Sequence, residues 1–294
     1  MKILFCNNIL KPNTVDEAFI DEYKNAINNG FEILLYNYEE KSIGNIKENE
    51  KMETVIYRGW MMTPVEYENL YSILLLKNYR LINDSTEYRN CHYLPESLKY
   101  IENYTPKTIF QKIEDNNSIK ILIENSKIFN GKAVIVKDYV KSEKYYWDTA
   151  FYVEDSNNSQ KLSETINNLI ELRGDYLNEG IVIREFVELN NVQKHSKCNM
   201  PLSEEYRLFF YKNELLCIFN YWEEIEYNME KPDFKDFEII GKNIKSNFFT
   251  MDIARNKNGK LIIIELGDGQ VSGIPENEDK NILYQKIKER QTSA

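Results

Sequence analysis

The sequence predicts an α/β domain followed by a larger domain of mixed α+β structure, and three observations support this fold class. The chain has 294 residues, enough for about two domains at the usual length of roughly 100–200 residues each. Apolar runs alternate with helical patterns over residues 1–104, which is typical of βαβ units around a parallel sheet. Two later stretches have the pattern of antiparallel hairpins, so we expect mixed sheets within residues 105–294.

The first domain is expected to contain four short strands and two helices. The strands are predicted at residues 3–6, 31–36, 54–57 and 80–82, and the helices at residues 15–28 and 65–77. Pro64 marks the start of the second helix, and the polar run Asn83-Asp84-Ser85 is expected to end the last strand. Pro106 disfavours helix at the residue before it, so we place a linker and the domain boundary there.

The second domain is expected to combine strands, one long helix and two hairpins. A β-branched strand covers residues 133–137, a helix residues 160–172, and another strand residues 180–187. The first hairpin joins residues 206–211 to 215–221, and the second joins residues 248–255 to 260–266 through a turn that ends in Asn-Gly.

Composition and charge exclude several classes of protein. With 42% hydrophobic and 29% charged residues the chain falls in the globular range, which argues against disorder. The net charge of −10 argues against an extended nucleic-acid groove or an anionic membrane surface, although a few placed cations are compatible with a small anionic ligand. No apolar run reaches the roughly 20 residues of a membrane span, and the N-terminal run is shorter than a signal sequence requires, so the expected compartment is the cytoplasm.

Cysteine and histidine are too sparse and too scattered for a zinc knuckle, a disulfide framework or a multi-histidine metal site. We expect reduced thiols. The residues concerned are Cys6, Cys91, Cys198, Cys217, His92 and His195.

Two carboxylates on the last hairpin are candidates for a metal site. Counting outward from its turn pairs Arg255 with Lys260 and puts Asp252 and Glu265 on one face of the hairpin. Neighbouring carboxylates repel each other unless a cation lies between them, and Mg²⁺ usually takes one or two carboxylates together with phosphates and water. Asp268 offers a third oxygen ligand. The alternative is that these acids face solvent.

Several cations are candidates for binding an anionic ligand. Lys137, Lys141 and Lys144 fall within eight residues and could hold a polyphosphate as point charges. Arg184 and Arg207 each interrupt an apolar strand, where an unpaired guanidinium is costly. Each arginine either faces a ligand or pairs with a nearby acid, for which the candidates are Glu185, Glu205 and Glu224.

Taken in order, these elements resemble the ATP-grasp superfamily from about residue 106 to residue 275. The segment around Lys107 resembles the start of the nucleotide-binding subdomain, and the strand that ends in Lys137 resembles the one whose lysine contacts nucleotide phosphate. Residues 183–187 resemble the hinge whose backbone binds adenine. The resemblance thus implies a nucleotide site that includes Glu185, Phe186 and Val187, with Glu188 at the ribose.

The resemblance also assigns catalytic, metal and substrate residues. Arg207 lies in a strand similar to the one that stabilises the transferred phosphate in ribosomal-protein glutamate ligases, and Arg184 and Lys144 complete the expected catalytic cations. Asp252 and Glu265 match the two magnesium carboxylates. The run Tyr57-Arg58-Gly59-Trp60 resembles the clade named for two arginines and a lysine, in which we expect Arg58 at the acceptor substrate.

What the resemblance implies is a Rossmann-like pre-ATP-grasp domain over residues 1–104 and an ATP-grasp domain over residues 105–294. The implied activity is an ATP- and Mg²⁺-dependent ligase that joins a carboxylate to an amine through an acyl phosphate, with a peptide or protein as substrate. Two alternatives stay open: a catalytically inert nucleotide-binding or interaction module, and a kinase that stops at the phosphorylated product.

Two departures from the superfamily pattern bear on the site. The chain has Glu265-Leu-Gly267-Asp268 where the superfamily usually has Glu-x-Asn, so either Asp268 replaces the asparagine as a ligand or the metal geometry differs. The glycine-rich lid expected after Lys137 is also replaced, in this chain by Lys-Ser-Glu-Lys-Tyr-Tyr-Trp.

Overall fold

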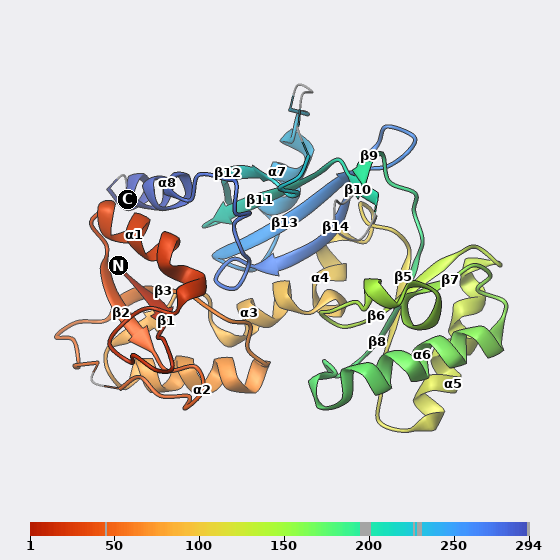
Figure 1. The fold of residues 1–294 in the computed structure, drawn as a ribbon, viewed down its shortest axis with the longest axis horizontal. Helices are drawn as coiled ribbons and strands as arrows, with labels where there is room; N and C mark the ends of the chain where they lie inside the picture. Colours follow the sequence, from red (N-terminus) through yellow and green to blue (C-terminus); the bar gives the residue numbers. More distant parts are fainter. Residues whose placement is uncertain (45, 195–200, 226, 228–230, 293–294) are drawn as a thin grey trace. The chain divides into compact units, whose positions relative to one another are not determined.

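The computed structural model describes residues 1–44, 46–194, 201–225, 227 and 231–292 (Figure 1). The chain forms two compact units, each assembled from separate stretches of sequence. The first contains Met1–His92, Val192–Ile253 and Leu266–Ala294, and the second contains Tyr93–Asn191 and Ala254–Glu265. The domain boundary expected near Pro106 therefore lies inside the second unit. His195 and Cys198 fall outside the described residues.

A parallel sheet forms the N-terminal part of the first unit, as the alternating pattern predicts. Its strands follow the order β2-β1-β3-β4, and each neighbouring pair is parallel. The strands, red to orange in Figure 1, are β1 (Lys2–Cys6), β2 (Glu32–Tyr36), β3 (Glu53–Arg58) and β4 (Tyr79–Leu81). This arrangement is consistent with the expected Rossmann-like domain.

Both faces of this sheet are buried, which explains its continuous apolar strands. Alternate side chains of β1 point to opposite faces, so Ile3 joins one hydrophobic cluster and Leu4 another. The Ile3 side packs against α1 (Ile20–Asn28), which follows a short 3₁₀ turn (Glu17–Phe19), and the Leu4 side against α2 (Pro64–Leu75).

Helix α2 starts where Pro64 predicts, and a further helix starts where the sequence predicted only a stop. A reciprocal capping box between Thr63 and Glu66 fixes the start of α2. The backbone N–H of Glu87 likewise donates to Asp84 Oδ1 at 2.8 Å, and the N–H of Asp84 donates back to the Glu87 carboxylate. The polar run at Asp84 therefore begins α3 (Ser85–His92) rather than a loop.

A second sheet follows the order β12-β11-β13-β14. The predicted hairpin of β11 (Glu205–Tyr211) and β12 (Glu214–Asn220) is confirmed, with antiparallel pairing and a bulge at Phe209/Phe210. The remaining elements in this part of the chain are β9 (Asn191–Lys194), β10 (Pro201–Ser203), α7 (Lys235–Gly241), β13 (Phe248–Arg255), β14 (Leu261–Asp268) and α8 (Asn281–Thr292).

The last hairpin closes one residue nearer its tip than predicted. The N–H of Asn256 donates to the carbonyl of Lys260 at 2.9 Å, and the N–H of Gly259 donates to the carbonyl of Asn256. Gly259 has φ +82°, so it occupies the left-handed position of a bulged turn. The predicted pairing of Arg255 with Lys260 is therefore wrong.

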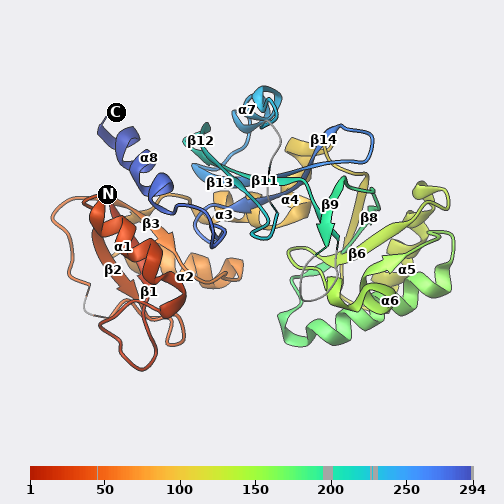
Figure 2. The same cartoon turned by 45° about the horizontal axis from the view of Figure 1, so that its top comes forward.

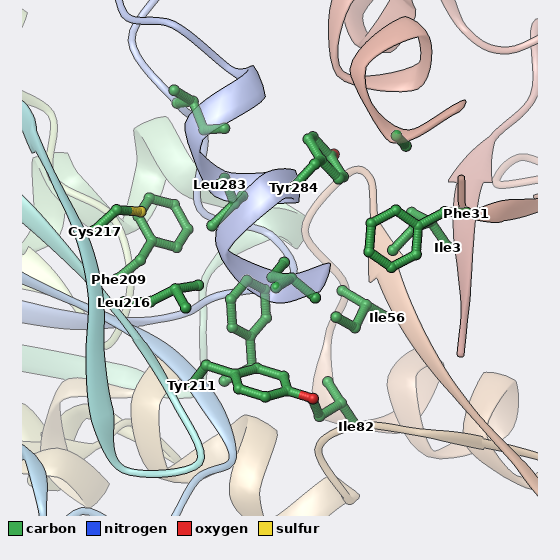
Figure 3. Close-up of a cluster of buried hydrophobic side chains, with 14 of the residues drawn as sticks. Ile3, Phe31, Ile56, Ile82, Phe209, Tyr211, Leu216, Cys217, Leu283 and Tyr284 are labelled. Atoms are coloured by element: carbon green, nitrogen blue, oxygen red, sulfur yellow. The ribbon is translucent and has the colours of Figure 1, made fainter. Parts of the chain in front are cut away.

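One hydrophobic cluster joins the two ends of the chain within the first unit (Figure 3). Leu283 and Tyr284 of α8 lie between side chains of the parallel sheet, such as Ile3 and Ile56, and side chains of the hairpin, such as Phe209. Residues 1–92 thus share their core with later parts of the chain.

The second unit is built on the sheet β5-β8-β6-β7, in which β8 pairs antiparallel with both β5 and β6. Helices α5 (Asn116–Asn125) and α6 (Ser159–Arg173) cover one face of this sheet (Figures 1 and 2). The other elements of this unit are α4 (Leu94–Ile101), β5 (Thr108–Lys112), β6 (Val134–Asp138), β7 (Tyr152–Val153), β8 (Gly180–Glu185), and short turns at Ser126–Phe129, Lys144–Tyr146, Trp147–Phe151 and Gly174–Tyr176.

Within these described ranges, every helix is too short or too polar to cross a membrane.

Candidate active site

A predicted catalytic arginine and a predicted metal carboxylate form an ion pair in the first unit. Arg207 lies in β11, and Asp252 lies on the neighbouring strand β13. The guanidinium donates from Nε to Asp252 Oδ1 at 2.8 Å and from Nη2 to Oδ2 at 2.7 Å, which is a bidentate arrangement. Arg207 also donates to the carbonyl of Gly273 and lies 4.8 Å from the ring centroid of Tyr221. This carboxylate partner is 45 residues away along the chain.

A second pair joins a predicted phosphate-binding lysine to the other predicted metal carboxylate, in the second unit. Lys137 lies near the end of β6, and its Nζ is 3.0 Å from Oε2 of Glu265. The Lys137 side chain is 7% exposed and that of Glu265 is 36% exposed. Burying an ammonium without a partner is costly, so Lys137 requires this carboxylate or another anion.

Arg184 supports the strand that carries Glu265. Its guanidinium is buried in β8 and donates to the carbonyls of Ile263 and Ile264 and to the hydroxyl of Thr105. Burial lowers its pKa to about 10, while the charge of Glu265 acts in the opposite direction. Its Nε has no hydrogen-bond partner among the described atoms. Arg184 therefore contacts the backbone just before Glu265, and its assignment as a catalytic residue stays a prediction.

The predicted adenine hinge leaves the sheet between β5 and β6. The N–H of Glu185 donates to the carbonyl of Lys107 at 2.8 Å, and the N–H of Phe186 donates to the carbonyl of Ala133 at 2.8 Å. The Phe186 ring meets two aromatic side chains edge to face, that of Tyr152 at 5.1 Å and that of Trp147 at 5.9 Å. An aromatic surface thus lies beside the hinge, which the sequence analysis did not single out.

The other predicted nucleotide and catalytic residues are on the surface of the second unit. The exposed Lys107 donates from Nζ to the carbonyl of Ile128 at 3.0 Å, and the exposed Glu188 pairs with Lys257 at 2.8 Å. Lys144 is exposed in a short 3₁₀ turn. The structure shows no ligand role for these three, and their assignments stay predictions.

Asp268 is a structural residue of the first unit in this geometry. It is fully buried, its Oδ2 accepts from Asn83 at 2.6 Å, and its Oδ1 accepts from both the backbone and the side chain of Gln270. Burial raises its pKa to about 7, although the hydrogen bonds from Asn83 and Gln270 act in the opposite direction. Both oxygens therefore accept hydrogen bonds from protein donors, and the assignment of Asp268 as a metal ligand stays a prediction.

Arg58, expected at the acceptor substrate, is also held inside the first unit. Its side chain is 2% exposed and makes two hydrogen bonds, of 2.7 and 2.8 Å, to the carboxylate of Glu22 in α1. It donates further to the carbonyls of Gly269 and Ser272, and Tyr284 donates to Glu22 at 2.6 Å. The charge of this side chain is thus compensated within the fold, and its assignment to the acceptor substrate stays a prediction. The sequence signal that was missed is Glu22 itself, one helical turn from the buried Ala26.

Each of the two carboxylates Asp252 and Glu265 fits magnesium by its chemistry. Mg²⁺ prefers oxygen ligands and commonly takes one or two carboxylates, with phosphate oxygens and water completing the shell. Asp252 and Glu265 are ligands of that kind, each balanced by a cation. In the part of the chain that the structure describes, no three His, Cys, Asp or Glu side chains are grouped to hold a metal ion.

Comparison with known proteins identifies one family model and many solved structures of the same fold. The model for "ATP-grasp domain, R2K clade family 3" matches residues 129–287, more than half of the chain. No curated protein matches the sequence.

Three solved structures illustrate the shared fold. The RimK domain protein ATP-grasp from Sphaerobacter thermophilus DSM 20745 has a TM-score of 0.61 at 11% identity, over 98% of both chains. D-cycloserine synthetase DcsG has a TM-score of 0.59 at 11% identity, over 99% of both chains. The ATP-grasp ligase PsnB, complexed with precursor peptide PsnA2 and AMPPNP, has a TM-score of 0.57 at 11% identity, over 100% of this chain and 99% of its own. At such identities the likeness establishes the fold, and the predicted fold class is confirmed.

Proposed function

The chain belongs to R2K clade family 3 of the ATP-grasp domains, and we propose that it uses ATP and Mg²⁺ to join a carboxylate to an amine through an acyl phosphate. The predicted family is confirmed, and with it the enzyme class, an ATP-dependent ligase of the ATP-grasp type. The acyl-phosphate route, the substrates and the residue roles below are the proposal.

The observation that carries the proposal is the double ion pairing of the site residues. Arg207 holds Asp252, and Lys137 holds Glu265, so each predicted phosphate-binding cation neutralises one predicted metal carboxylate. Bound MgATP brings both signs of charge. With MgATP bound, Arg207 and Lys137 would bind phosphate oxygens, and Asp252 and Glu265 would hold the metal. Buried charges then remain compensated in both states, as their desolvation requires.

The reaction follows from positioning and charge neutralisation, without a nucleophilic side chain. A substrate carboxylate oxygen attacks the γ-phosphorus, the bond to the β–γ bridging oxygen breaks, and ADP leaves. The amine nitrogen then attacks the acyl carbon, the carbon–oxygen bond to phosphate breaks, and phosphate leaves while the amine loses a proton to solvent. Arg207 and Lys137 bind the phosphate oxygens, and Arg184 holds the strand that presents Glu265. Magnesium at the two carboxylates would neutralise the phosphate charge as it moves.

We propose a peptide carboxylate as the substrate class. Support comes from PsnB, which shares the fold and is described in complex with a precursor peptide and an ATP analogue. Because fold does not fix substrate, this assignment depends on the acceptor screen below.

Hydroxylamine trapping tests the acyl phosphate directly. The protein is incubated with MgATP, a panel of carboxylate peptides and hydroxylamine as the amine. Hydroxylamine converts an acyl phosphate into a stable hydroxamate, so we expect hydroxamate, ADP and phosphate in equal amounts. An Arg207→Met variant should lose the product, whereas Arg255→Met, at the end of β13 and only partly buried, should retain it.

The same assay distinguishes the ligase from the two alternatives. These alternatives stay open because Asp268, in the altered metal loop, is buried. A kinase would give ADP and a stable phosphorylated product without hydroxamate or free phosphate. An inert module would bind ATP and release no ADP across the panel. Either pattern would overturn the ligase proposal.

A further inference from the structure

A tight turn after β6 fixes the position of Lys141, which the sequence analysis grouped with Lys137 and Lys144 without a specific role. The backbone N–H of Asp138 donates to the carbonyl of Lys141 at 2.9 Å, which reverses the chain within four residues. The buried Asp138 carboxylate also accepts from the N–H groups of Val140 and Lys141. Lys141 is therefore held close to the end of the strand that carries Lys137.

The Asp138 carboxylate is itself anchored from the opposite side. Its Oδ2 accepts from Arg173 Nε at 3.1 Å and from the side-chain amide of Asn178 at 2.9 Å. Five protein donors thus converge on one fully buried carboxylate, counting both N–H groups of the turn and the backbone N–H of Asn178. The turn is rigid before any ligand arrives.

Three cations lie near this turn, Lys137, Lys141 and Arg173, and the described ion pairs of the nearby carboxylates involve Lys137 and Arg173. Arg173 already pairs with both Asp138 and Glu143, at 3.1 and 3.2 Å. The carboxylate of Glu265 is bonded to Lys137, and its negative charge also acts on Lys141.

Lys141 is partly buried, and within the described residues its Nζ makes no hydrogen bond or ion pair. Burial lowers its pKa, the charges of Lys137 and Arg173 act in the same direction, and those of Glu265 and Asp138 oppose them. In the part of the chain that the structure describes, this cation therefore has opposite charges nearby but no direct ion-pair partner. An anion supplied from outside would complete the cluster.

We propose that Lys141, together with Lys137, binds the β- and γ-phosphates of the nucleotide. This inference rests on the proposed function, because it takes ATP as the ligand of the second unit. A side-chain ammonium would then stabilise the phosphates where this chain lacks a glycine-rich lid. Lys141 is distinct from the exposed Lys144, which the sequence analysis favoured from the same cluster.

Nucleotide binding by calorimetry, in the presence of Mg²⁺ and with the full chain, tests the assignment. ATP, ADP and AMP are compared for the wild type, Lys141→Met and Lys141→Arg, with Lys120→Met as the control because Lys120 is exposed on α5 of the same unit. Thermal unfolding confirms that each variant is folded. We expect Lys141→Met to weaken ATP and ADP binding about 10- to 100-fold, the usual value of a hydrogen bond to a charged group. AMP binding should be unchanged, and Lys141→Arg should recover most of the loss.

The outcomes separate this inference from the proposed function. If the wild type and the Lys141→Met variant bind ATP equally well, the role of Lys141 is overturned and the proposed function is not. Equal weakening of ATP binding and AMP binding would also overturn this role. Such a result would mean that the substitution disturbs the structure, because AMP has no β- or γ-phosphate. Failure of the wild type to bind any of the three nucleotides would overturn the proposed function, and this inference with it.

Discussion

At the scale of single residues, the buried ion pairs of this chain differ in their exposure and in their other hydrogen-bond partners. These differences decide which pairs can take part in ligand binding. The pairs Arg207–Asp252 and Lys137–Glu265 retain some exposure and can exchange partners with a charged ligand. The pair Arg58–Glu22 is almost fully buried and also bonds backbone carbonyls, so exchange there would leave charges without partners. Burial and the kind of partner therefore separate candidate site residues from structural ones.

Replacing Asp268 by asparagine should destabilise the fold. Asn83 donates its amide to Asp268 Oδ2, while the Asn83 carbonyl oxygen already accepts from the N–H groups of Asn247 and Phe248. Asn83 cannot turn over without losing those bonds, so Asp268→Asn would place donors face to face or leave one unsatisfied. We expect a loss of about 1–3 kcal/mol in the free energy of unfolding by urea denaturation. The exposed Asp236→Asn should change it by less than about 0.5 kcal/mol. Equal stability of the two variants would contradict the structural role.

The pKa of Asp268 gives a pH dependence with a definite sign. Burial raises this pKa to about 7 in the folded chain, above the ordinary value of 3.8. The folded state then binds more protons than the unfolded state between those values, so this group's contribution to stability is complete below pH 3.8 and is lost as the pH rises through about 7. We expect the stability of the wild type relative to Asp268→Asn to fall between pH 5 and pH 8 in urea titrations. A difference that stays constant or grows over this range would show that the pKa is not raised.

At the scale of elements, patterns that repeat along the chain predict the fold well. They do not predict where a turn or a helix start shifts by a single residue. The parallel sheet and the hairpin of β11 and β12 follow from alternation and turn residues. The closing turn at Asn256 was misplaced because a bulged turn takes up one residue that counting does not register. The start of α3 was missed because Asp84 is equally suited to a loop and to a helix N-terminus.

The candidate site was predictable in part, for a related reason. Sequence identifies which charged residues interrupt apolar strands, and so it identified Arg207, Asp252, Lys137 and Glu265. Which charges pair depends on contacts between distant segments, such as the 128 residues that separate Lys137 from Glu265. The internal partners of Arg58 and Asp268 come from equally distant segments, which is why both were assigned to ligands.

A glycine in β8 offers a test of the sheet β5-β8-β6-β7 in the second unit. A Cβ on Gly180 would lie 2.4 Å from the carbonyl oxygen of Gln111 and 2.8 Å from Cα of Lys112, both backbone atoms of β5. Gly180→Ala should therefore separate β8 from β5 and reduce the free energy of unfolding by about 1–3 kcal/mol. Gly273→Ala, where a Cβ meets nothing within 4 Å, is the matched control and should be close to neutral in the same chemical denaturation series. The account of this sheet fails if both alanines are tolerated alike.

At the scale of the whole molecule, the first unit depends on contacts between the two ends of the chain. Glu22 of α1, Arg58 of β3 and Tyr284 of α8 form one buried network, beside the cluster in Figure 3 that also joins these segments. The N-terminal sheet is thus stabilised by the C-terminal helix.

Breaking this network should therefore affect the entire first unit. Glu22→Gln removes the counter-ion of Arg58 and leaves a buried guanidinium uncompensated, which typically costs roughly 3–5 kcal/mol. We expect a large fall in the midpoint of denaturation, while the exposed Glu17→Gln should leave it unchanged. A Glu22→Gln protein as stable as the wild type would show that the network is dispensable.

ATP binding with and without Mg²⁺ tests the central claim most directly. Calorimetry compares the wild type with the double variant Asp252→Asn, Glu265→Gln, whose amide oxygens can still accept hydrogen bonds from Arg207 and Lys137. The account predicts that Mg²⁺ strengthens ATP binding to the wild type and that the double variant, folded as judged by thermal unfolding, loses this dependence. ATP binding that is independent of Mg²⁺ in both proteins, or no binding in either, would contradict it.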